Sequence, residues 1–488
     1  MRVNASDCDR GPGRLRFRAD DPTLTPYGGL AIVGEFARRT RLVELVDAEL
    51  GAVRGVRPVK ARRRGLSAGG LLVSLAECQI VGAECFDDIE NVRADTASAV
   101  LRAVAGTPSA PTARQLSRCY RRTHIRAIER ALARVGEGVD RDLGREISDP
   151  VTLDLDATET EVYGRGPRRR GAARSHSGAL AYQSYVVTWA ERGRALTSEL
   201  EPGNRARITA PQSARMIACA KRLLPAGHGP VTARVDSGFY SAQLMTALRQ
   251  QQVRFSISAP RTSSMWNTIT EIAEEDWADA HEMHGAQVAE TPFTPNGWAH
   301  EPLRLIVRRV SVTAEEIHRG SPRARRRSTI PADQLQMVLD GQLNSTYAYS
   351  FIVTDIPANE KTTVDVEHFH RHRAQVEERF KDAKLGQPLR HLPSGDLNAN
   401  RLWLACSLTA LNITALLCDL SPAAAASGQA PDDTPLRRHA KALCRILFCV
   451  PARITRTARQ LTLRLPAGFR YLHTFQATYD NITALGVP

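Results

Sequence analysis

The segment VTLDLDAT, residues 151–158, places two carboxylates inside an apolar run typical of a buried strand. Successive side chains of a strand point to opposite faces, so Asp154 and Asp156 project from the same face. Burial of a carboxylate is costly unless another group compensates its charge. This segment is therefore both a constraint on the fold and the first candidate for a functional site.

The chain around this segment alternates between strand and helix patterns. Strands are expected first at 151–158, 180–190 and 194–203, then at 229–236 and 253–260, and helices at 211–224 and 241–251. The order β-β-β-α-β-α-β predicts an α/β fold in which helices cover a mixed sheet.

Composition divides the rest of the chain. The expected units are a polar arm (1–27), a helical domain (28–147), an α/β domain (148–260 and 347–420), a β-rich insertion (261–346), a linker (421–435) and a basic C-terminal segment (436–488). In the helical domain, residues 106–122 fit the second half of a helix-turn-helix as well as an ordinary capped helix of a bundle. The region after residue 435 also fits a helical subdomain that packs on the core.

The formal net charge of +14 favours a polyanionic partner, with nucleic acid ahead of an anionic membrane. Basic clusters at 60–64, 165–174 and 319–327 fit phosphate contacts, although such clusters also serve as solubilising faces. Phosphate contacts carry no sequence information. Base recognition is therefore expected from the helical N-terminal region or the C-terminal segment.

The cysteines and the longest apolar run indicate a cytosolic chain. The nine cysteines are scattered and form no C-x2-C pair, which favours reduced core thiols over disulfides or a zinc site. The first residues lack the apolar stretch of a secretory signal. Residues 402–418 are at the short limit for a membrane span and include polar residues, so a buried core helix is favoured.

A second carboxylate stands at a strand end. Asp236 follows the strand VTARV and precedes Ser237-Gly238, which starts a turn. Ligands of open α/β sheets bind at the carboxyl ends of strands, and Mg²⁺ prefers oxygen ligands. An aspartate in such a place can instead cap the following turn. Two of them in successive strand–turn units, Asp156 and Asp236, favour a metal site.

The segment from Thr363 to Leu385 is helical in pattern and heavily charged. His370, Arg373, Glu377 and Lys384 fall on one face of this helix. A solvated face of salt bridges has the same appearance. The histidines at 368, 370 and 372 are not spaced as a zinc site requires.

These motifs together carry a resemblance. Asp156-Ala157-Thr158, the sequence DSGF at 236–239, and a Y-x2-R-x3-E-x6-K pattern beginning at His370 resemble bacterial insertion-sequence transposases of the DDE type. The similarity is greatest to the insertion-sequence-1380 group of the insertion-sequence-4-like superfamily. The segment LDLDATE and the tail PARITRTARQLTLRLP also resemble that group, and the resemblance spans about residues 28–480.

The resemblance implies an RNase H-like core and a site for two divalent metals. Asp156, Asp236 and Glu377 would bind two Mg²⁺ ions, for which Mn²⁺ would substitute. Asp154 is the alternative to Asp156 as the first aspartate of the metal site, but only Asp156 is followed by the x-Thr of the family pattern. Glu378 competes with Glu377, but its spacing from the arginine of the signature differs by one residue.

The remaining signature residues would contact DNA. The resemblance implies that Arg373 and Lys384 hold DNA phosphates beside the metals. His370 replaces the usual tyrosine; it can donate a hydrogen bond to phosphate but lacks the phenol. The insertion contains Trp266, Trp277 and Trp298, and the resemblance implies that one of them supports a flipped base. Trp298 is selected, with packing against a strand as the alternative.

The implied activity is cut-and-paste DNA transposition by an endonuclease of a mobile element. Strands would be cleaved at terminal inverted repeats, through hairpin ends, and transferred to target DNA by a dimer in the synaptic complex, in the nucleoid of a bacterial cytoplasm. The alternatives are a catalytically inactive transposon-derived DNA-binding protein and another RNase H-like nuclease. Three converging carboxylates argue against the first; the helical region, insertion and basic tail argue against the second.

Overall fold

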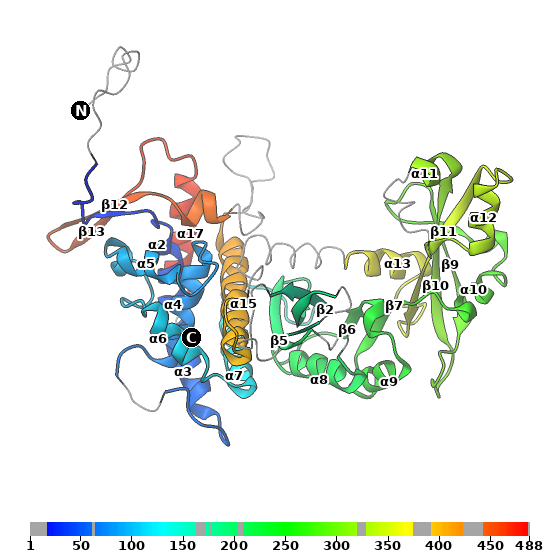
Figure 1. Cartoon of the computed structure of the whole chain (residues 1–488), viewed down its shortest axis with the longest axis horizontal. Helices are drawn as coiled ribbons and strands as arrows, with labels where there is room; N and C mark the ends of the chain where they lie inside the picture. Colours follow the sequence, from blue (N-terminus) through cyan, green and yellow to red (C-terminus); the bar gives the residue numbers. More distant parts are fainter. Residues whose placement is uncertain are drawn as a thin grey trace, which may run out of the picture.

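The computed structural model describes residues 17–60, 64–162, 172–174, 178–203, 208–319, 328–373, 392–422 and 443–486. The molecule is elongated (Figure 1). Helices from both ends of the chain form one end, a sheet flanked by helices occupies the middle, and β9, β10 and β11 with their helices form the other end. We call the first part the helical body.

The central sheet has the predicted mixed topology. β2 (Val151–Glu161), β4 (Leu180–Trp189) and β5 (Arg194–Pro202) form an antiparallel meander. The helix α8 (Ala210–Lys221) then leads to β6 (Val231–Val235), and α9 (Ala242–Gln250) leads to β7 (Arg254–Ala259). β6 lies parallel to both β2 and β7. The mixed α/β sheet predicted from the strand and helix order is confirmed.

The segment expected as an insertion extends this same sheet. β7 pairs with β11 (Ser345–Thr354), followed outward by β10 (Leu303–Thr313), β9 (Ala286–Phe293) and β8 (Ala278–Asp279). The short β3 (Ala173–Arg174) pairs with β4, which completes a sheet of ten strands. Around the outer strands lie α10 (Ser263–Ile269), α11 (Ala314–Arg319) and α12 (Ala332–Leu339). The region from 261 to 346 therefore shares its backbone hydrogen bonds with the central strands.

The two faces of the central sheet differ in chemistry. Leu153 and Leu155 of β2 join Met216 of α8 and Leu244 of α9 in one apolar core. The alternate residues of β2, Asp154 among them, point to the opposite face. There α13 (Thr363–Arg371) packs across β7, β9 and β10. The carboxylates of β2 thus face the side of the sheet that carries α13.

The helical body is built from α2 (Leu30–Arg39), α3 (Leu42–Ala52), α4 (Ala68–Ile80), α5 (Ile89–Ala94), α6 (Ala110–Ser117), α7 (Arg122–Asp142) and α17 (Leu472–Thr483). The expected turn-and-helix at 106–122 contains α6, which packs against α15 (Leu397–Leu420). DNA binding by this helix stays a prediction.

The apolar run at 402–418 lies within α15. By length and composition α15 is the one helix of the described residues that could cross a membrane, but 78% of its most apolar window is buried inside the protein. It packs against α4, α7 and β5, which joins the helical body to the sheet. Its packing is that of a core helix.

The C-terminal region departs from the helical expectation. β12 (Ala452–Thr457) and β13 (Gln460–Arg464) form a hairpin, and β12 also pairs with β1 (Leu24–Thr25) near the other end of the chain. Among the described residues of this region, Cys444–Phe448 and α17 are helical as expected. The physical reason for the hairpin lies in the strand formers Ile454, Thr455 and Thr457 of β12 and in the segment QLTLR of β13, where polar and apolar residues alternate with the period of two that favours a strand.

One buried carboxylate of the helical body forms no ion pair with the described residues. Glu77 in α4 is 1% exposed, and its Oε1 accepts a hydrogen bond from the Ala103 N–H at 2.8 Å. Its Oε2 has no hydrogen-bond partner among the described residues. Burial raises the pKa of Glu77 to about 7. The folded state therefore holds a proton that the unfolded chain would release above its ordinary pKa of 4.5.

We predict that Glu77→Gln stabilises the protein at alkaline pH. The amide keeps the acceptor oxygen and removes the ionisation penalty, which is roughly 3 kcal/mol at most. The sign follows from the raised pKa: the penalty is absent below pH 4.5, grows between pH 4.5 and 7 and is complete above pH 7. Urea unfolding at pH 5 and pH 8 measures the difference. An equal effect of the substitution at both pH values would contradict the prediction.

Candidate active site

The fold brings Asp156, in the middle of β2, next to Asp236, which follows the last residue of β6. β2 and β6 run parallel, and Leu155 is the register partner of Val235. The next residue along each strand is the aspartate. Arg373, just beyond α13, reaches both: its Nη2 lies 3.0 Å from Asp156 Oδ1 and its Nη1 lies 3.6 Å from Asp236 Oδ1. One guanidinium therefore bridges the two carboxylates.

Local backbone bonds orient both carboxylates. Asp156 Oδ1 accepts the N–H of Ala157 at 2.9 Å, and Asp236 Oδ1 accepts the N–H of Ser237 at 2.7 Å. The second bond caps the short helical turn Ser237–Phe239. The capping role considered for these aspartates is therefore real for Asp236, and it coexists with the contact to Arg373. Asp236 remains half exposed, whereas Asp156 is largely covered.

Asp154, two residues before Asp156, is committed to a different partner. It is fully buried and forms two bonds with Arg234 of β6, Nε to Oδ1 at 2.6 Å and Nη2 to Oδ2 at 2.7 Å. Burial raises the pKa of the Asp154 carboxyl, and the guanidinium opposes this shift. Arg234 Nη1 also donates to the carbonyl oxygen of Phe369 at 2.5 Å. This ion pair thereby ties β2 and β6 to α13.

His370 fastens α13 to β7. Its Nδ1 lies 2.8 Å from Ser256 Oγ and its Nε2 lies 2.8 Å from Ser258 Oγ. The ring is 7% exposed, and burial, aided by nearby arginines, lowers its pKa to about 3. The imidazole is therefore neutral at physiological pH. A phosphate contact by His370, as predicted from the signature, would require one of these bonds to be given up.

The ion pairs of Glu367, a residue of α13, were not predicted from the sequence. Glu367 is fully buried and accepts from Arg308 Nη1 at 2.6 Å and from Arg371 Nε at 3.2 Å. Arg234 and Arg308 interrupt apolar strands just as Asp154 does. A charged residue within an apolar strand could have marked these positions as candidates for buried ion pairs. The sequence alone does not tell which charged residues pair.

Of the remaining predicted site residues, the structure describes only Trp298, which lies away from the aspartate pair. Glu377 and Lys384 lie outside the described residues. Trp298 is 6% exposed, its Nε1 donates to the Glu301 carbonyl oxygen at 2.8 Å, and its ring meets Phe255 edge to face. This is the packing role that was the alternative for Trp298. Support of a flipped base stays a prediction and would require the indole to leave this position.

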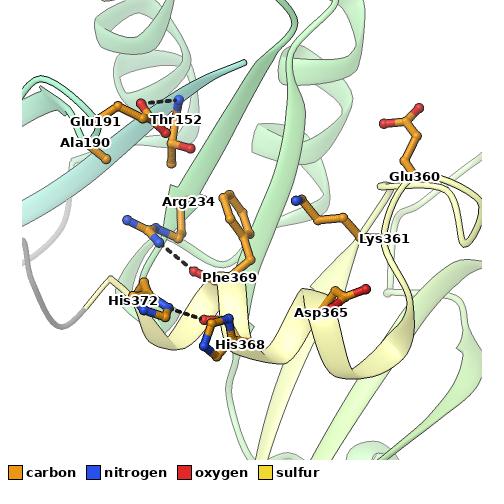
Figure 2. A pocket seen from close by; sticks show the side chains of 10 residues that line it. All are labelled: Thr152, Ala190, Glu191, Arg234, Glu360, Lys361, Asp365, His368, Phe369 and His372. Carbon is orange, nitrogen blue, oxygen red and sulfur yellow. Dashed lines mark hydrogen bonds between the residues drawn. The ribbon is translucent and has the colours of Figure 1, made fainter. Parts of the chain in front are cut away.

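A cavity of about 400 Å³ opens beside α13 but is not the site of the aspartate pair. Figure 2 shows Arg234 and Phe369 within it, joined by their hydrogen bond, with His368 and His372 on the same helix. Thr152, at the start of β2, also lines it. Thr152 is four residues from Asp156, or about 13 Å along a strand. The lining mixes acidic and basic side chains.

The aspartate pair has the chemistry of a cation site. Carboxylate oxygens are the ligands that Mg²⁺ prefers, and the position between them already holds the positive charge of Arg373. Among the described residues, no group of three histidine, cysteine, aspartate or glutamate side chains could hold a metal ion. The pair therefore fits a divalent cation only if a further ligand joins it.

The chain matches the family described as Transposase DDE domain group 1 over residues 12–320 and 339–487. It belongs to this family, and the protein is a DDE-type transposase enzyme. The resemblance to DDE transposases noted in the sequence is thereby confirmed at the level of the family.

The chain was also compared with solved structures and with curated proteins. A cryo-EM structure of a piggyBac transposase synaptic complex with hairpin DNA matches with a TM-score of 0.40 and 11% identity, covering 80% of this chain and 75% of that chain. No curated protein matches.

We predict that Arg234→Met destabilises the fold by about 3–5 kcal/mol, because Asp154 would remain buried without its cation. The double variant Asp154→Leu with Arg234→Met should recover much of this loss, since no charge is then buried. Arg254→Met, at an exposed pair with Glu360, is the matched control and should cost at most about 1 kcal/mol. Urea unfolding compares the variants. Additive losses in the double variant would contradict the prediction.

Proposed function

We propose that this protein is the transposase of an insertion sequence. It would bind the terminal inverted repeats of its element and catalyse strand cleavage and strand transfer with Asp156, Asp236 and Glu377. The observation that carries the proposal is the pair of aspartates at adjacent positions of two parallel strands, bridged by Arg373, in a chain of the DDE transposase family.

An RNase H-like core is part of this proposal. That fold orders its strands 3-2-1-4-5, with the first three antiparallel and the last two parallel to strand one. The order β5-β4-β2-β6-β7 has this pattern of neighbours and directions. It supports the assignment of Asp156 to the first strand and of Asp236 to the end of the fourth. Membership of the insertion-sequence-1380 group is proposed from the sequence motifs.

Asp156, Asp236 and Glu377 would hold two Mg²⁺ ions, or Mn²⁺ in their place. When bound, such ions supply Lewis-acid stabilisation of the charge that develops on phosphoryl oxygens. The residues of the chain would position the DNA. A guanidinium offers two parallel donors that match a phosphate, so Arg373 would exchange its contacts with the aspartates for a DNA phosphate, and Lys384 would hold a second phosphate.

Arg373 is well placed for this exchange. Its side chain is 9% exposed and follows directly on α13, which the Asp154–Arg234 pair and His370 fix to the sheet. In the absence of DNA the same guanidinium compensates the repulsion between two neighbouring carboxylates. We infer that His370 positions Arg373 through α13.

The details of the DNA reaction are proposed from the family resemblance. Cleavage would pass through hairpin ends, with Trp298 supporting a flipped base. A dimer would join the two element ends in the bacterial cytoplasm, at the nucleoid. The net charge of +14 supports DNA as the partner.

We predict that the wild-type chain in Mg²⁺ cuts a labelled duplex at the boundary of the inverted repeat flanking its gene. Asp156→Asn, Asp236→Asn and Glu377→Gln should each lower the cleavage rate by roughly 10²- to 10⁴-fold, because several kcal/mol of transition-state stabilisation are lost. Binding of the same duplex should persist. Electrophoresis of the cleavage products and a gel-shift assay measure the two effects.

Asp340→Asn, at an exposed carboxylate after α12, serves as the matched control and should cleave normally. Binding without cutting by the wild type would favour a DNA-binding protein that has lost its chemistry. Cutting that survives all three active-site substitutions would assign the reaction to other residues.

A further inference from the structure

The hairpin of β12 and β13 lies at the edge of the helical body, and β1 pairs only with its base, at Ala452 and Arg453. Beyond these residues the hairpin is a two-stranded ribbon. Its strands are joined by the two residues Ala458 and Arg459, with Thr457 opposite Gln460. In Figure 1 the ribbon lies at the end of the molecule opposite α11 and α12. The helical body separates it from the strands that carry Asp156 and Asp236.

One face of the ribbon is attached to the protein only at its base. Ile454 is 8% exposed, and its cross-strand partner Leu463 packs against the same apolar core of the helical body. The next pair on this face, Arg456 and Leu461, is already exposed. The tip of the ribbon therefore projects beyond the body.

The other face carries only polar and cationic side chains. Because cross-strand partners share a face and alternate residues repeat it, this face is formed by Arg453, Thr455, Thr457, Gln460, Thr462 and Arg464. Arg464 Nε lies 3.4 Å from Thr455 Oγ1, which agrees with this assignment. We call it the outer face.

Most of the positive charge of the ribbon has no ion-pair partner among the described residues. The ribbon, residues 452–464, contains four arginines and no acidic residue. Arg453 and Arg464 are direct cross-strand partners, an arrangement of like charges that destabilises a hairpin. Asp21 lies 3.0 Å from Arg453, but among the described residues no carboxylate lies within ion-pair distance of Arg456, Arg459 or Arg464. A polyanion would supply the missing negative charge.

The shape and residue types of the outer face identify that polyanion. The major groove of B-DNA is about 12 Å wide and admits a two-stranded ribbon. Arginine pairs with guanine, glutamine with adenine, and the threonine methyl contacts the thymine methyl. We propose that the outer face of the β12–β13 ribbon reads the base sequence of double-stranded DNA in the major groove. This inference rests on the proposed function, since the sequence read would be that of the element's ends.

The outer face would contact bases, and other residues of the ribbon would contact phosphates. Gln460, Thr462 and Arg464 point to the bases, whereas Arg456 and the turn residue Arg459 reach the phosphates beside the groove. Contacts to bases give specificity, and contacts to phosphates strengthen binding to any sequence. Substitutions on the ribbon should therefore separate into these two classes.

The test is a selection of bound duplexes from a library with 20 randomised base pairs, using the full chain without divalent metal. The wild type should enrich a motif. The variant Gln460→Ala with Arg464→Ala should bind that motif at least about tenfold more weakly and keep its affinity for a scrambled duplex. Arg456→Gln should weaken binding to both duplexes and flatten the salt dependence. Fluorescence anisotropy measures the affinities.

Arg215→Gln, at an exposed arginine of α8 outside the basic clusters and the ribbon, is the matched control and should bind as the wild type does. Thermal melting of each variant shows that it is folded. Enrichment of the same motif with equal affinity by the outer-face variant would overturn the inference, as would the absence of any motif for the wild type. Neither outcome depends on Asp156 or on metal, so failure here is distinct from failure of the cleavage assay.

Discussion

The arrangement of the site depends on the buried ion pair between Asp154 and Arg234. It joins the neighbouring strands β2 and β6, and through the Phe369 carbonyl it holds the last turn of α13 against them. The serines of β7 hold His370 of the same turn. These bonds together decide where the chain leaves α13, and therefore where Arg373 meets Asp156 and Asp236. The Asp154–Arg234 pair takes no part in the proposed chemistry, but it fixes the positions of Arg373, Asp156 and Asp236.

Much of the sheet and the aspartate pair could be predicted from the sequence, because both depend on local rules. Alternation identifies a strand, and parallel strands bring their carboxyl ends together, so Asp156 and Asp236 could be placed side by side. The partner of Asp154 could not be predicted, since Arg234 is 80 residues away and the pairing depends on register. The burial of His370 was missed because a helix pattern does not show which face a sheet will cover. The continuation of the sheet from β7 to β11 likewise depends on contacts distant in sequence.

The surroundings of His370 give a physical reason for an imidazole at this position. An imidazole offers two nitrogens on opposite sides of a small ring, and two serines of one strand, Ser256 and Ser258, meet both of them. A phenol has one oxygen and could satisfy only one of the two hydroxyls. His370 and the two serines of β7 are therefore matched to each other where α13 packs on the sheet.

The continuity of the ten-stranded sheet has a consequence for any attempt to shorten this protein. A segment inserted between two strands of a finished domain can often be excised and replaced by a short loop. Here the segment 261–346 supplies β10, which covers the side of β11 that β7 leaves open. Its removal would leave a bare strand edge with the apolar residues Phe351 and Val353 beside it, an edge of the kind that recruits other chains and aggregates. A soluble minimal enzyme would therefore have to retain β10 or block the edge of β11 by design.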